Sequence, residues 1–446
     1  MRYIFMDNYR GFAETIVPLR DATFLVGENS TGKSSFLAAV NLLSTQQFVL
    51  SPYHFPRGTL PFLGGFSDIV SITSADRSYF SIGALLTGGS LVAAGKGGIE
   101  CEFLILKFCD EEGQPRLNTY IHYVNGKLGV LRFKGDEALY RFTRQSPSAA
   151  DARSVLDFLL RVYRHSFEGD SAFKALPKEL PRGLPPTLML QMLESVGSDE
   201  SMGVPIRSME IPGFGFPAVM GFSRAEWSWF APIRTQPQRI YEGFKTDFTP
   251  AGDHTPYLIK SSLSSAETAK EFAQLLDHFG ESSGLFSSVT AHSFGRDPSA
   301  PFEVMVQLHG TPLNISNVGY GVSQVLPVVV EMITRPRGHG FAIQQPEVHL
   351  HPRAQAALGN LLHFLVVEHG HRYLVETHSD YMIDRFRLRV KETGRPKEAQ
   401  VVFFWRTSSG NKAQVLRIND KGQYPREQPD EFRRFFINEE LRLLEI

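Results

Sequence analysis

Residues 23–34 read TFLVGENSTGKS, an apolar run that ends in the motif G-x-x-x-x-G-K-S, and this stretch decides the fold. The apolar run predicts a buried strand. After the motif, Phe36, Val40 and Leu43 recur at helical spacing and predict an amphipathic helix. A strand, a glycine-rich loop and a helix in this order form a phosphate-binding loop, so the stretch predicts an α/β fold.

The loop is suited to the phosphates of a nucleoside triphosphate. Gly27 and Gly32 let the backbone curl, so that successive N–H groups and the helix N-terminus point at the phosphates. Lys33 adds a positive charge, and the Ser34 hydroxyl is placed to ligate Mg²⁺. We expect Ser35 to lie on the helix surface beside the site rather than to act as a second metal ligand. The nucleotide-binding residues predicted in this loop are Gly27, Asn29, Ser30, Thr31, Gly32, Lys33, Ser34 and Ser35.

Two later strands are predicted to end in polar residues. Residues 341–347 read FAIQQPE, and residues 373–380 read YLVETHSD. The helix between them is predicted to have Pro352 in its first turn and to stop at Gly370. Because parallel strands present their carboxyl ends to a ligand at one edge of the sheet, these polar groups would face the same ligand.

A further helix start is predicted upstream, where residues 317–324 read NVGYGVSQ. Its glycines and Ser323 would expose a helix N-terminus, which suits an anion. We expect Pro327 in or just beyond the first turn, since a proline is tolerated there.

Composition excludes several classes of protein. The 446 residues carry 46 Lys and Arg against 47 Asp and Glu, a net charge of −1, which argues against bulk electrostatic binding to nucleic acid or to an anionic membrane. No apolar stretch approaches the roughly 20 residues that span a bilayer, and the first residues lack the apolar run of a signal peptide. We therefore expect a soluble, cytoplasmic protein with no membrane partner. Two cysteines, Cys101 and Cys109, support neither a disulfide framework nor a cysteine metal cluster.

The motifs, taken in order, resemble those of ATP-binding-cassette ATPases of the RecF, SMC and OLD (overcoming lysogenization defect) type. The resemblance rests on the phosphate loop, the glycine- and serine-rich helix start, Q-Q-P-E-x-H-L-H-P and E-T-H-S. It is closest to the AAA-family ATPases with a DUF3696 C-terminal region, which are associated with prokaryotic defence. It implies an ABC-type P-loop ATPase head, which consists of a mixed β lobe and a parallel-sheet core with flanking helices and carries a helical insertion. The expected segments are 1–147, an N-terminal ATPase lobe that is β-rich from about residue 60; 148–226, a mainly helical insertion; and 227–446, a C-terminal ATPase lobe.

The resemblance also implies roles for single residues. Gly321 and Ser323 of one subunit would close over the γ-phosphate held by another, so ATP would join a homodimer or a higher homo-oligomer. His378 matches the switch histidine, which contacts the γ-phosphate or the attacking water. The family's metal-associated acid and its catalytic glutamate are replaced here by Gln344 and Gln345. The resulting metal candidates are Ser34 and Gln344, and the catalytic candidates are Gln344, Gln345, Glu347 and His378.

The two glutamines predict slow hydrolysis. An amide orients water and accepts a hydrogen bond from metal-bound water, but it cannot act as a general base. Glu347 is the nearest remaining carboxylate and would share a strand face with Gln345 if the backbone stayed extended. A catalytic role for Glu347 and a role in pinning the loop are both open. The chain is then either an ATP-held switch by nature or one in which a glutamine has been put in place of an acid.

We expect an ATP- and Mg²⁺-dependent ATPase that acts as a nucleotide-gated clamp and controls a separate effector, such as a nuclease, in defence against phage or mobile DNA. The alternatives are a RecF-like DNA-repair ATPase that binds nucleic acid directly and a scaffold that holds nucleotide only for stability. The basic run at residues 385–397 is read as a solvated helix face in preference to a nucleic-acid contact. His349 and His351 are read as loop-shaping residues in preference to zinc ligands. For Arg234 we favour structural pairing over contact with a nucleotide.

Overall fold

The computed structural model of the protein describes residues 2–53, 55, 63–87, 101–124, 126–135, 137–149, 151–167, 169, 172–177, 183–196, 227–245, 247–265, 267–396 and 398–432. Contacts divide the chain into two compact units that do not follow the chain order. Unit 1 comprises Met1–Leu19, Asn29–Arg224 and Trp405–Ala413, and unit 2 comprises Arg20–Glu28, Ala225–Phe404 and Gln414–Ile446. The segment bounds at 147 and 226 stay a prediction.

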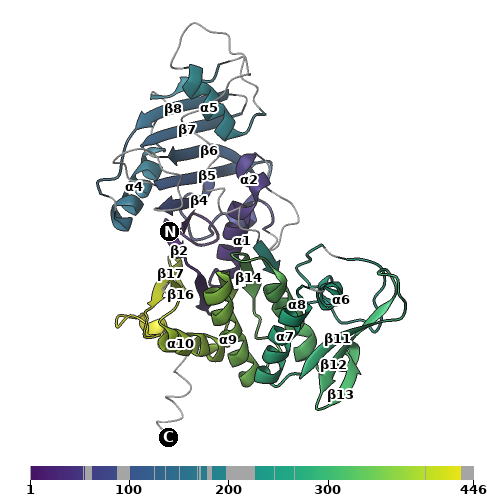
Figure 1. Ribbon diagram of the computed structural model, residues 1–446. Helices are drawn as coiled ribbons and strands as arrows, with labels where there is room; N and C mark the ends of the chain where they lie inside the picture. Colours follow the sequence, from purple (N-terminus) through teal and green to yellow (C-terminus); the bar gives the residue numbers. More distant parts are fainter. Residues whose placement is uncertain are drawn as a thin grey trace. The chain divides into compact units, whose positions relative to one another are not determined.

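Unit 1 is built on an eight-stranded antiparallel sheet in the order β2-β1-β4-β5-β6-β7-β8-β9 (Figure 1). Helix α4 (Ala152–His165) packs Val155, Phe158 and Leu159 into a core with aromatic and aliphatic residues of this sheet. The β-rich character expected from residue 60 is confirmed. The strands are β1 (Arg2–Asp7), β2 (Thr15–Leu19), β4 (Tyr79–Thr87), β5 (Cys101–Glu111), β6 (Gln114–Val124), β7 (Lys127–Lys134), β8 (Glu137–Arg144) and β9 (Lys174–Ala175).

The described residues of unit 1 form four more helices. Helix α1 buries Phe36, Val40 and Leu43, so the predicted apolar stripe after the phosphate loop is confirmed. The helices are α1 (Lys33–Ser44), α2 (Gln46–Leu50), α3 (Phe66–Ile69) and α5 (Pro186–Val196).

Unit 2 is built around a six-stranded sheet in the order β10-β14-β15-β3-β16-β17. The first five of these strands pair in parallel, which confirms the predicted parallel-sheet core. The sheet brings β3 beside β15, although most of the chain separates them in sequence. The strands are β3 (Ala22–Gly27), β10 (Trp227–Phe230), β14 (Gly340–Gln344), β15 (Arg372–Glu376), β16 (Ala399–Thr407) and β17 (Gly410–Ile418).

Helices α10, α9 and α7 of unit 2 lie side by side (Figure 1). Gly359 allows α9 to approach α10 closely, since a Cβ atom there would lie 2.4 Å from the carbonyl oxygen of Met382. Helix α9 begins at Pro352 and ends before Gly370, as predicted. The remaining elements are α6 (Thr255–Ser264), α7 (Ala269–Ser283), η3 (Ile315–Asn317), α8 (Tyr320–Thr334), α9 (Pro352–His369), α10 (Asp380–Thr393) and a three-stranded antiparallel sheet of β11 (Ser288–Ser293), β12 (Phe302–Leu308) and β13 (Thr311–Asn314).

The position expected for Pro327 is wrong. Helix α8 begins at Tyr320, and Pro327 lies inside it rather than near its first turn. The ring fits because residue 252 is glycine, where an added Cβ would lie 2.6 Å from the Pro327 Cβ. A proline has no N–H to give to the carbonyl of Ser323, four residues earlier.

A buried polar network fixes α8 in unit 2. Glu331 is fully buried and accepts hydrogen bonds from Ser228 Oγ at 2.9 Å, His254 Nε2 at 3.0 Å and Arg335 Nε at 2.6 Å. Burial raises the pKa of Glu331, but these donors and the charge of Arg335 outweigh it and leave the pKa below the usual carboxyl value. The network ties the last turn of α8 to β10 and to the start of α6.

The expected α/β fold class, a β lobe and a parallel-sheet core with helices, is therefore confirmed. Among the described residues, no helix combines the length and the apolar character needed to cross a membrane.

Candidate functional site

The phosphate loop follows strand β3 directly. The strand ends at Gly27, whose φ is 146°, and helix α1 begins at Lys33 with Gly32 as its N-cap. The Lys33 side chain is only 4% exposed, so its charge is held within the loop rather than in solvent. The other predicted residues of the loop divide into buried Thr31, half-buried Ser35, and exposed Asn29, Ser30 and Ser34.

Phe12 and Asn411 brace the loop within unit 1. A Cβ atom on Gly32 would lie 2.4 Å from Phe12 Cζ and 3.0 Å from Asn411 Nδ2, so only glycine fits here. Asn411 Nδ2 donates to the Arg10 carbonyl oxygen at 2.9 Å, which holds its amide in place. Neither residue can be predicted from sequence pattern, because their contact with the loop depends on long-range folding.

The carboxyl ends of β14 and β15 lie next to each other. Gln344, the last residue of β14, is opposite Glu376, the last residue of β15, and its Nε2 donates to Glu376 Oε2 at 3.1 Å. A carboxylate oxygen accepts hydrogen bonds, so the amide nitrogen of Gln344 faces Glu376. The amide oxygen, Oε1, can then accept a hydrogen bond from another group.

The backbone turns sharply after Gln344. Gln345 has a φ of 44°, and its N–H donates to the Glu376 carbonyl oxygen at 2.8 Å. The backbone is therefore not extended here, and the prediction that Gln345 and Glu347 share one face of the strand is wrong. The turn, rather than strand alternation, sets the position of Glu347.

Glu347 joins the ends of the two strands. Its Oε1 accepts a hydrogen bond from the His378 backbone N–H at 2.7 Å, while the His378 side chain is exposed. Burial raises the pKa of Glu347 above the usual carboxyl value, against the hydrogen bond from His378 and the charge of Arg234, which lower it. The hydrogen bond to the His378 N–H shows that this side chain pins the loop, which is one of the two roles left open by the sequence.

Arg234 is a buried cation beside these residues. It is 2% exposed, and its Nη2 donates to the Gln344 carbonyl oxygen at 3.2 Å. Its Nε and Nη1 have no hydrogen-bond partner among the described residues. Burial lowers the pKa of Arg234 to about 10, and the charge of Glu347 raises it. The guanidinium remains positive at neutral pH and provides a counter-charge for Glu347.

The start of α8 presents backbone rather than its serine. Gly319 and Tyr320 are exposed, and Gly321 lies so close to the next loop that a Cβ there would be 2.7 Å from the His349 carbonyl oxygen. Ser323 is 5% exposed, and its Oγ donates to the Tyr320 carbonyl oxygen at 2.9 Å. The hydroxyl therefore stabilises the first turn of α8.

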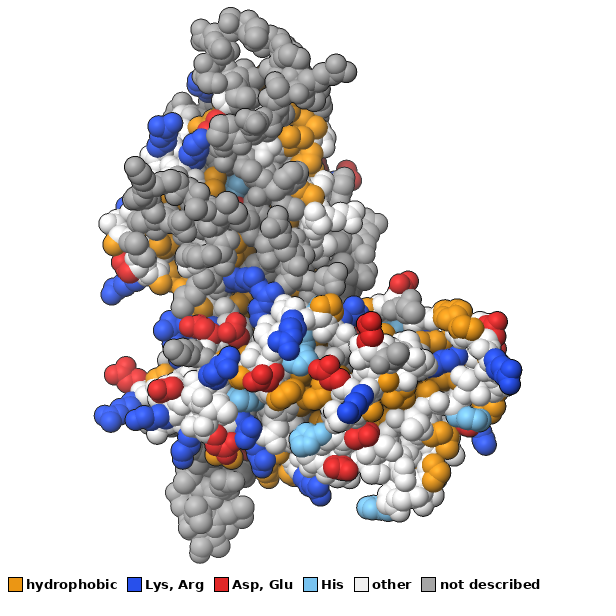
Figure 2. All heavy atoms as spheres, in the orientation of Figure 1, with side chains coloured by type: hydrophobic (Ala, Val, Ile, Leu, Met, Phe, Trp, Pro, Cys, Tyr) orange, Lys and Arg blue, Asp and Glu red, His pale blue; other side chains and the backbone are white. Residues whose placement is uncertain are grey.

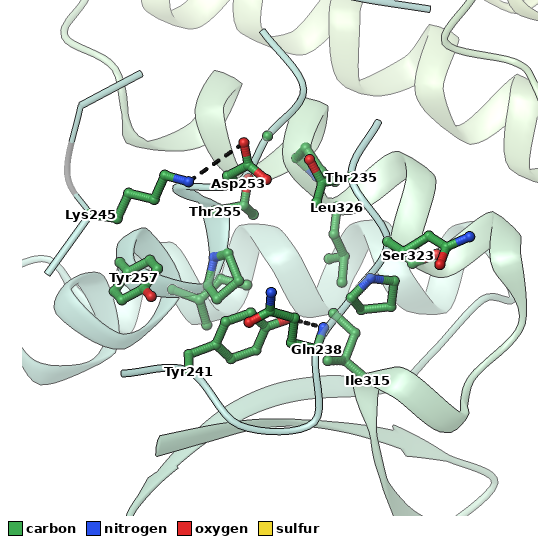
Figure 3. Close-up of a pocket in the computed structure, with 16 residues that line it drawn as sticks. Thr235, Gln238, Tyr241, Lys245, Asp253, Thr255, Tyr257, Ile315, Ser323 and Leu326 are labelled. Carbon is green, nitrogen blue, oxygen red and sulfur yellow. Dashed lines mark hydrogen bonds and ion pairs between the residues drawn. The ribbon is translucent and has the colours of Figure 1, made fainter. Parts of the chain in front are cut away.

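Ser323 also lines a cavity of about 120 Å³ beside α8. Figure 3 shows Ser323 and Leu326 of α8 on the wall of this cavity, together with Thr235 from the segment that follows Arg234. Lys245 and Asp253 form an ion pair of 3.6 Å there. The cavity connects the start of α8 with the segment that carries Arg234.

The histidines of the H-L-H-P turn shape the loop. His351 is the N-cap of α9, and its Nδ1 accepts from the Ala354 N–H at 3.4 Å. The ring of His349 contacts the ring of Tyr320 edge-on, with centroids 5.0 Å apart. Within the described ranges, no group of three or more His, Cys, Asp or Glu residues is arranged to hold a metal ion.

The structure thus brings Gln344, Gln345, Glu347 and the loop of His378 together at one edge of the unit 2 sheet. Gly27 belongs to the same sheet, because Leu25 of β3 pairs with Glu376. Sequence reasoning assigned no role to Glu376, although an acid directly after the apolar run at residues 373–375 follows the rule that identified the end of β14.

A strand, glycine-rich loop and helix on a parallel sheet define a P-loop nucleoside triphosphatase. The sequence model of the AAA ATPase domain family matches residues 1–85 and 245–383, just over half of the chain, and the chain belongs to this family. Such a protein is an ATPase that binds ATP with Mg²⁺. No curated protein matches the sequence.

The chain is similar to solved SMC head domains at low identity. An SMC head bound to the C-terminal winged-helix domain of ScpA aligns with 10% identity and a TM-score of 0.43, covering 93% of this chain and 97% of that one. An SMC head with an extended coiled coil, bound to the C-terminal domain of ScpA from Pyrococcus furiosus, gives 12% identity, a TM-score of 0.40 and coverage of 100% and 99%. The SMC head domain from Thermotoga maritima aligns with 11% identity and a TM-score of 0.35, covering 94% of this chain and 100% of that one.

Proposed function

We propose that this protein binds ATP tightly, hydrolyses it slowly and works as a nucleotide-gated dimeric clamp. One observation carries the proposal: the phosphate loop is intact, whereas the end of β14 presents the amides of Gln344 and Gln345. Binding needs the loop amides and Lys33, but fast hydrolysis needs a base that takes a proton from water. The chain keeps the loop and Lys33, and it lacks a base at the end of β14.

The binding roles are assigned from the loop motif, and the burial of Lys33 supports them. The loop amides and the N-terminus of α1 bind the phosphates, and buried Lys33 adds its charge. Ser34 and Gln344 offer a hydroxyl and an amide oxygen, which are the hard donors that Mg²⁺ accepts. When bound, Mg²⁺ neutralises charge on the phosphates.

The hydrolytic roles fall to the residues after β14. Gln345 orients water but accepts no proton. Glu347 is the proton acceptor that we propose, since its pKa is raised by burial. The absence of an acid at Gln345 lowers the rate by about 10²- to 10⁴-fold. ATP then stays bound long enough to hold an assembly closed.

The clamp and its partner come from the motif resemblance. In ATPases of the RecF, SMC and OLD type, a glycine- and serine-rich helix start meets the nucleotide of a second subunit. The exposed backbone of Gly319 and Tyr320 is available for such a contact, with Gly321 and Ser323 behind it. The resemblance to OLD-like ATPases with a DUF3696 region supports a role in antiviral defence with a separate effector, such as a nuclease.

The first test measures binding, turnover and assembly on the purified protein. We expect calorimetric titration to show Mg²⁺-dependent ATP binding that Lys33→Ala abolishes. Light scattering is expected to show a dimer or higher oligomer with ATP and a smaller species without it. Turnover by the protein alone at tens per second, above the median of about 10 s⁻¹ for enzymes, would rule out the slow clamp.

Direct binding to DNA in the RecF manner is the second candidate, and it has less support. On the basic helix α10, Arg387 pairs with Asp384 at 2.7 Å and Arg389 pairs with Glu392 at 2.6 Å. Figure 2 shows acidic and basic side chains interspersed over the visible face of unit 2, without a field of one sign. ATP-dependent DNA binding at about 50 mM salt that weakens steeply as salt rises would support this candidate.

A further inference from the structure

The candidate magnesium site lacks an acid where one is expected. Mg²⁺ bound with nucleotide phosphates is held in proteins by one or two carboxylates. The residues at the end of β14 are Gln344 and Gln345, and both are neutral at every pH. If the protein binds ATP with Mg²⁺ as proposed, a carboxylate on another element has to supply the negative charge.

Glu376 occupies the neighbouring position in the sheet. The pairing register places it opposite Gln344 on one side and opposite Leu25 of β3 on the other. Neighbouring strands lie about 4.8 Å apart, so Glu376 is one strand from β3 and Gln344 is two. The carboxylate is therefore nearer than the amide to the strand that continues into the phosphate loop at Gly27.

The orientation of Glu376 is fixed by contacts on both sides. Its backbone oxygen accepts from the Gln345 N–H at 2.8 Å, and the next residue, Thr377, donates its N–H to the Leu25 oxygen at 3.1 Å. Its Oε2 accepts from Gln344 Nε2 at 3.1 Å, so the two side chains lie on the same side of the sheet. Glu376 is 6% exposed, so solvent would only weakly screen its interaction with a cation.

The pair reproduces the chemistry of an acid at the end of β14. Gln344 directs its nitrogen at the carboxylate, and its oxygen is the remaining acceptor. A hard cation at this edge would meet an amide oxygen and a carboxylate, which together are the donor types that Mg²⁺ prefers. A carboxylate one strand away would then supply the negative charge that the end of β14 lacks.

We propose that Glu376 supplies the negative charge for Mg²⁺ at this site, in place of an acid at the end of β14. The inference rests on the proposed ATP·Mg²⁺ binding and assigns the charge to a residue on β15. It separates two functions, since Glu376 serves the metal while Glu347 serves the proton.

The test uses Mn²⁺ as the probe and measures its binding to the full-length protein by electron paramagnetic resonance. The nucleotide is adenylyl imidodiphosphate, which is not hydrolysed. For Glu376→Gln we expect Mn²⁺ affinity in the presence of nucleotide to fall by about 10- to 100-fold. The double variant Glu376→Gln with Gln344→Glu returns the acid to β14 and is expected to recover most of the affinity. Glu368→Gln, an exposed site on α9, is the matched control and is expected to bind as the wild type does.

The outcomes separate this inference from the proposed function. Equal Mn²⁺ affinity in the wild type and in Glu376→Gln, with nucleotide bound to both, overturns the inference and leaves ATP binding intact. A wild-type protein that binds no nucleotide overturns the proposed function and the inference with it. If Glu376→Gln does not fold, the folded double variant decides: Mn²⁺ affinity near that of the wild type supports the inference, and loss of affinity contradicts it.

Discussion

Replacing Gly32 by alanine is expected to displace the phosphate loop. The φ of 103° costs a side-chain-bearing residue about 1–3 kcal/mol. The new Cβ would also lie 2.4 Å from Phe12 Cζ, about 1 Å short of an ordinary contact. Phe12 is fully buried in a close-packed core, so the ring cannot simply move away and the loop has to shift. A misplacement of about 1 Å costs roughly 100-fold where position governs the reaction.

The matched control is Gly113→Ala. Gly113 has a φ of 77° and nothing within 4 Å of an added Cβ, so alanine there is strained but does not collide. We expect both variants to lose stability in urea unfolding, but only Gly32→Ala to lose ATP affinity in calorimetric titration and to lose turnover. Phe12→Leu in the Gly32→Ala background removes Cζ and is expected to restore part of the affinity. Equal ATP affinity in Gly32→Ala and Gly113→Ala would refute the steric reasoning.

Three further variants probe unit 2. Glu347→Gln is expected to lower ATP turnover by about 10²- to 10⁴-fold while ATP affinity is retained. If Glu347 is the base, the turnover of the wild type should fall as the pH decreases, starting above the usual carboxyl pKa. An unchanged rate in the variant would contradict this role. Arg234→Lys is expected to lower the free energy of unfolding by about 1.5–3 kcal/mol, which is the contribution of a hydrogen bond to a charged group, and to leave ATP affinity unchanged. A variant that keeps its stability but loses ATP affinity would mean that Arg234 contacts the nucleotide. Glu331→Gln is expected to cost about 3–5 kcal/mol at pH 7. Because the donors around Glu331 outweigh burial and lower its pKa, its contribution is present above the unfolded carboxyl pKa of about 4.3 and is lost as pH falls toward the folded value. The difference between the wild type and this variant in urea unfolding should therefore shrink below that pH, and a constant difference argues against the network.

The sequence predicts the parts of this site that depend on local pattern. The motif from Gly27 to Ser34 is contiguous, and the strand before it and the helix after it follow from periodicity. Helix α9 is predicted with its ends because proline and glycine mark them. These features depend on residues that lie close together in the sequence, so they can be predicted from the sequence alone.

The sequence does not predict features that depend on pairing between distant segments. Gln344 and Glu376 meet only because β14 and β15 pair in one register, and a shift of one strand by one residue would place the two side chains on opposite faces of the sheet. The left-handed backbone of Gln345 is likewise imposed by its bond to the Glu376 oxygen. Pro327 is accommodated inside α8 because Gly252, far away in sequence, leaves room for its ring.

The two carboxylates at this edge differ in what surrounds them, and this difference is the basis of the separate roles proposed above. Glu376 accepts a hydrogen bond from a neutral amide at the end of β14, and its carboxylate is the donor type that a hard cation prefers. Glu347 faces a backbone N–H and the charge of Arg234, and burial still raises its pKa, which favours proton transfer. Because binding of the metal and transfer of the proton rest on separate side chains, Glu376→Gln should change the Mg²⁺ dependence of ATP binding, whereas Glu347→Gln should change turnover at saturating Mg²⁺.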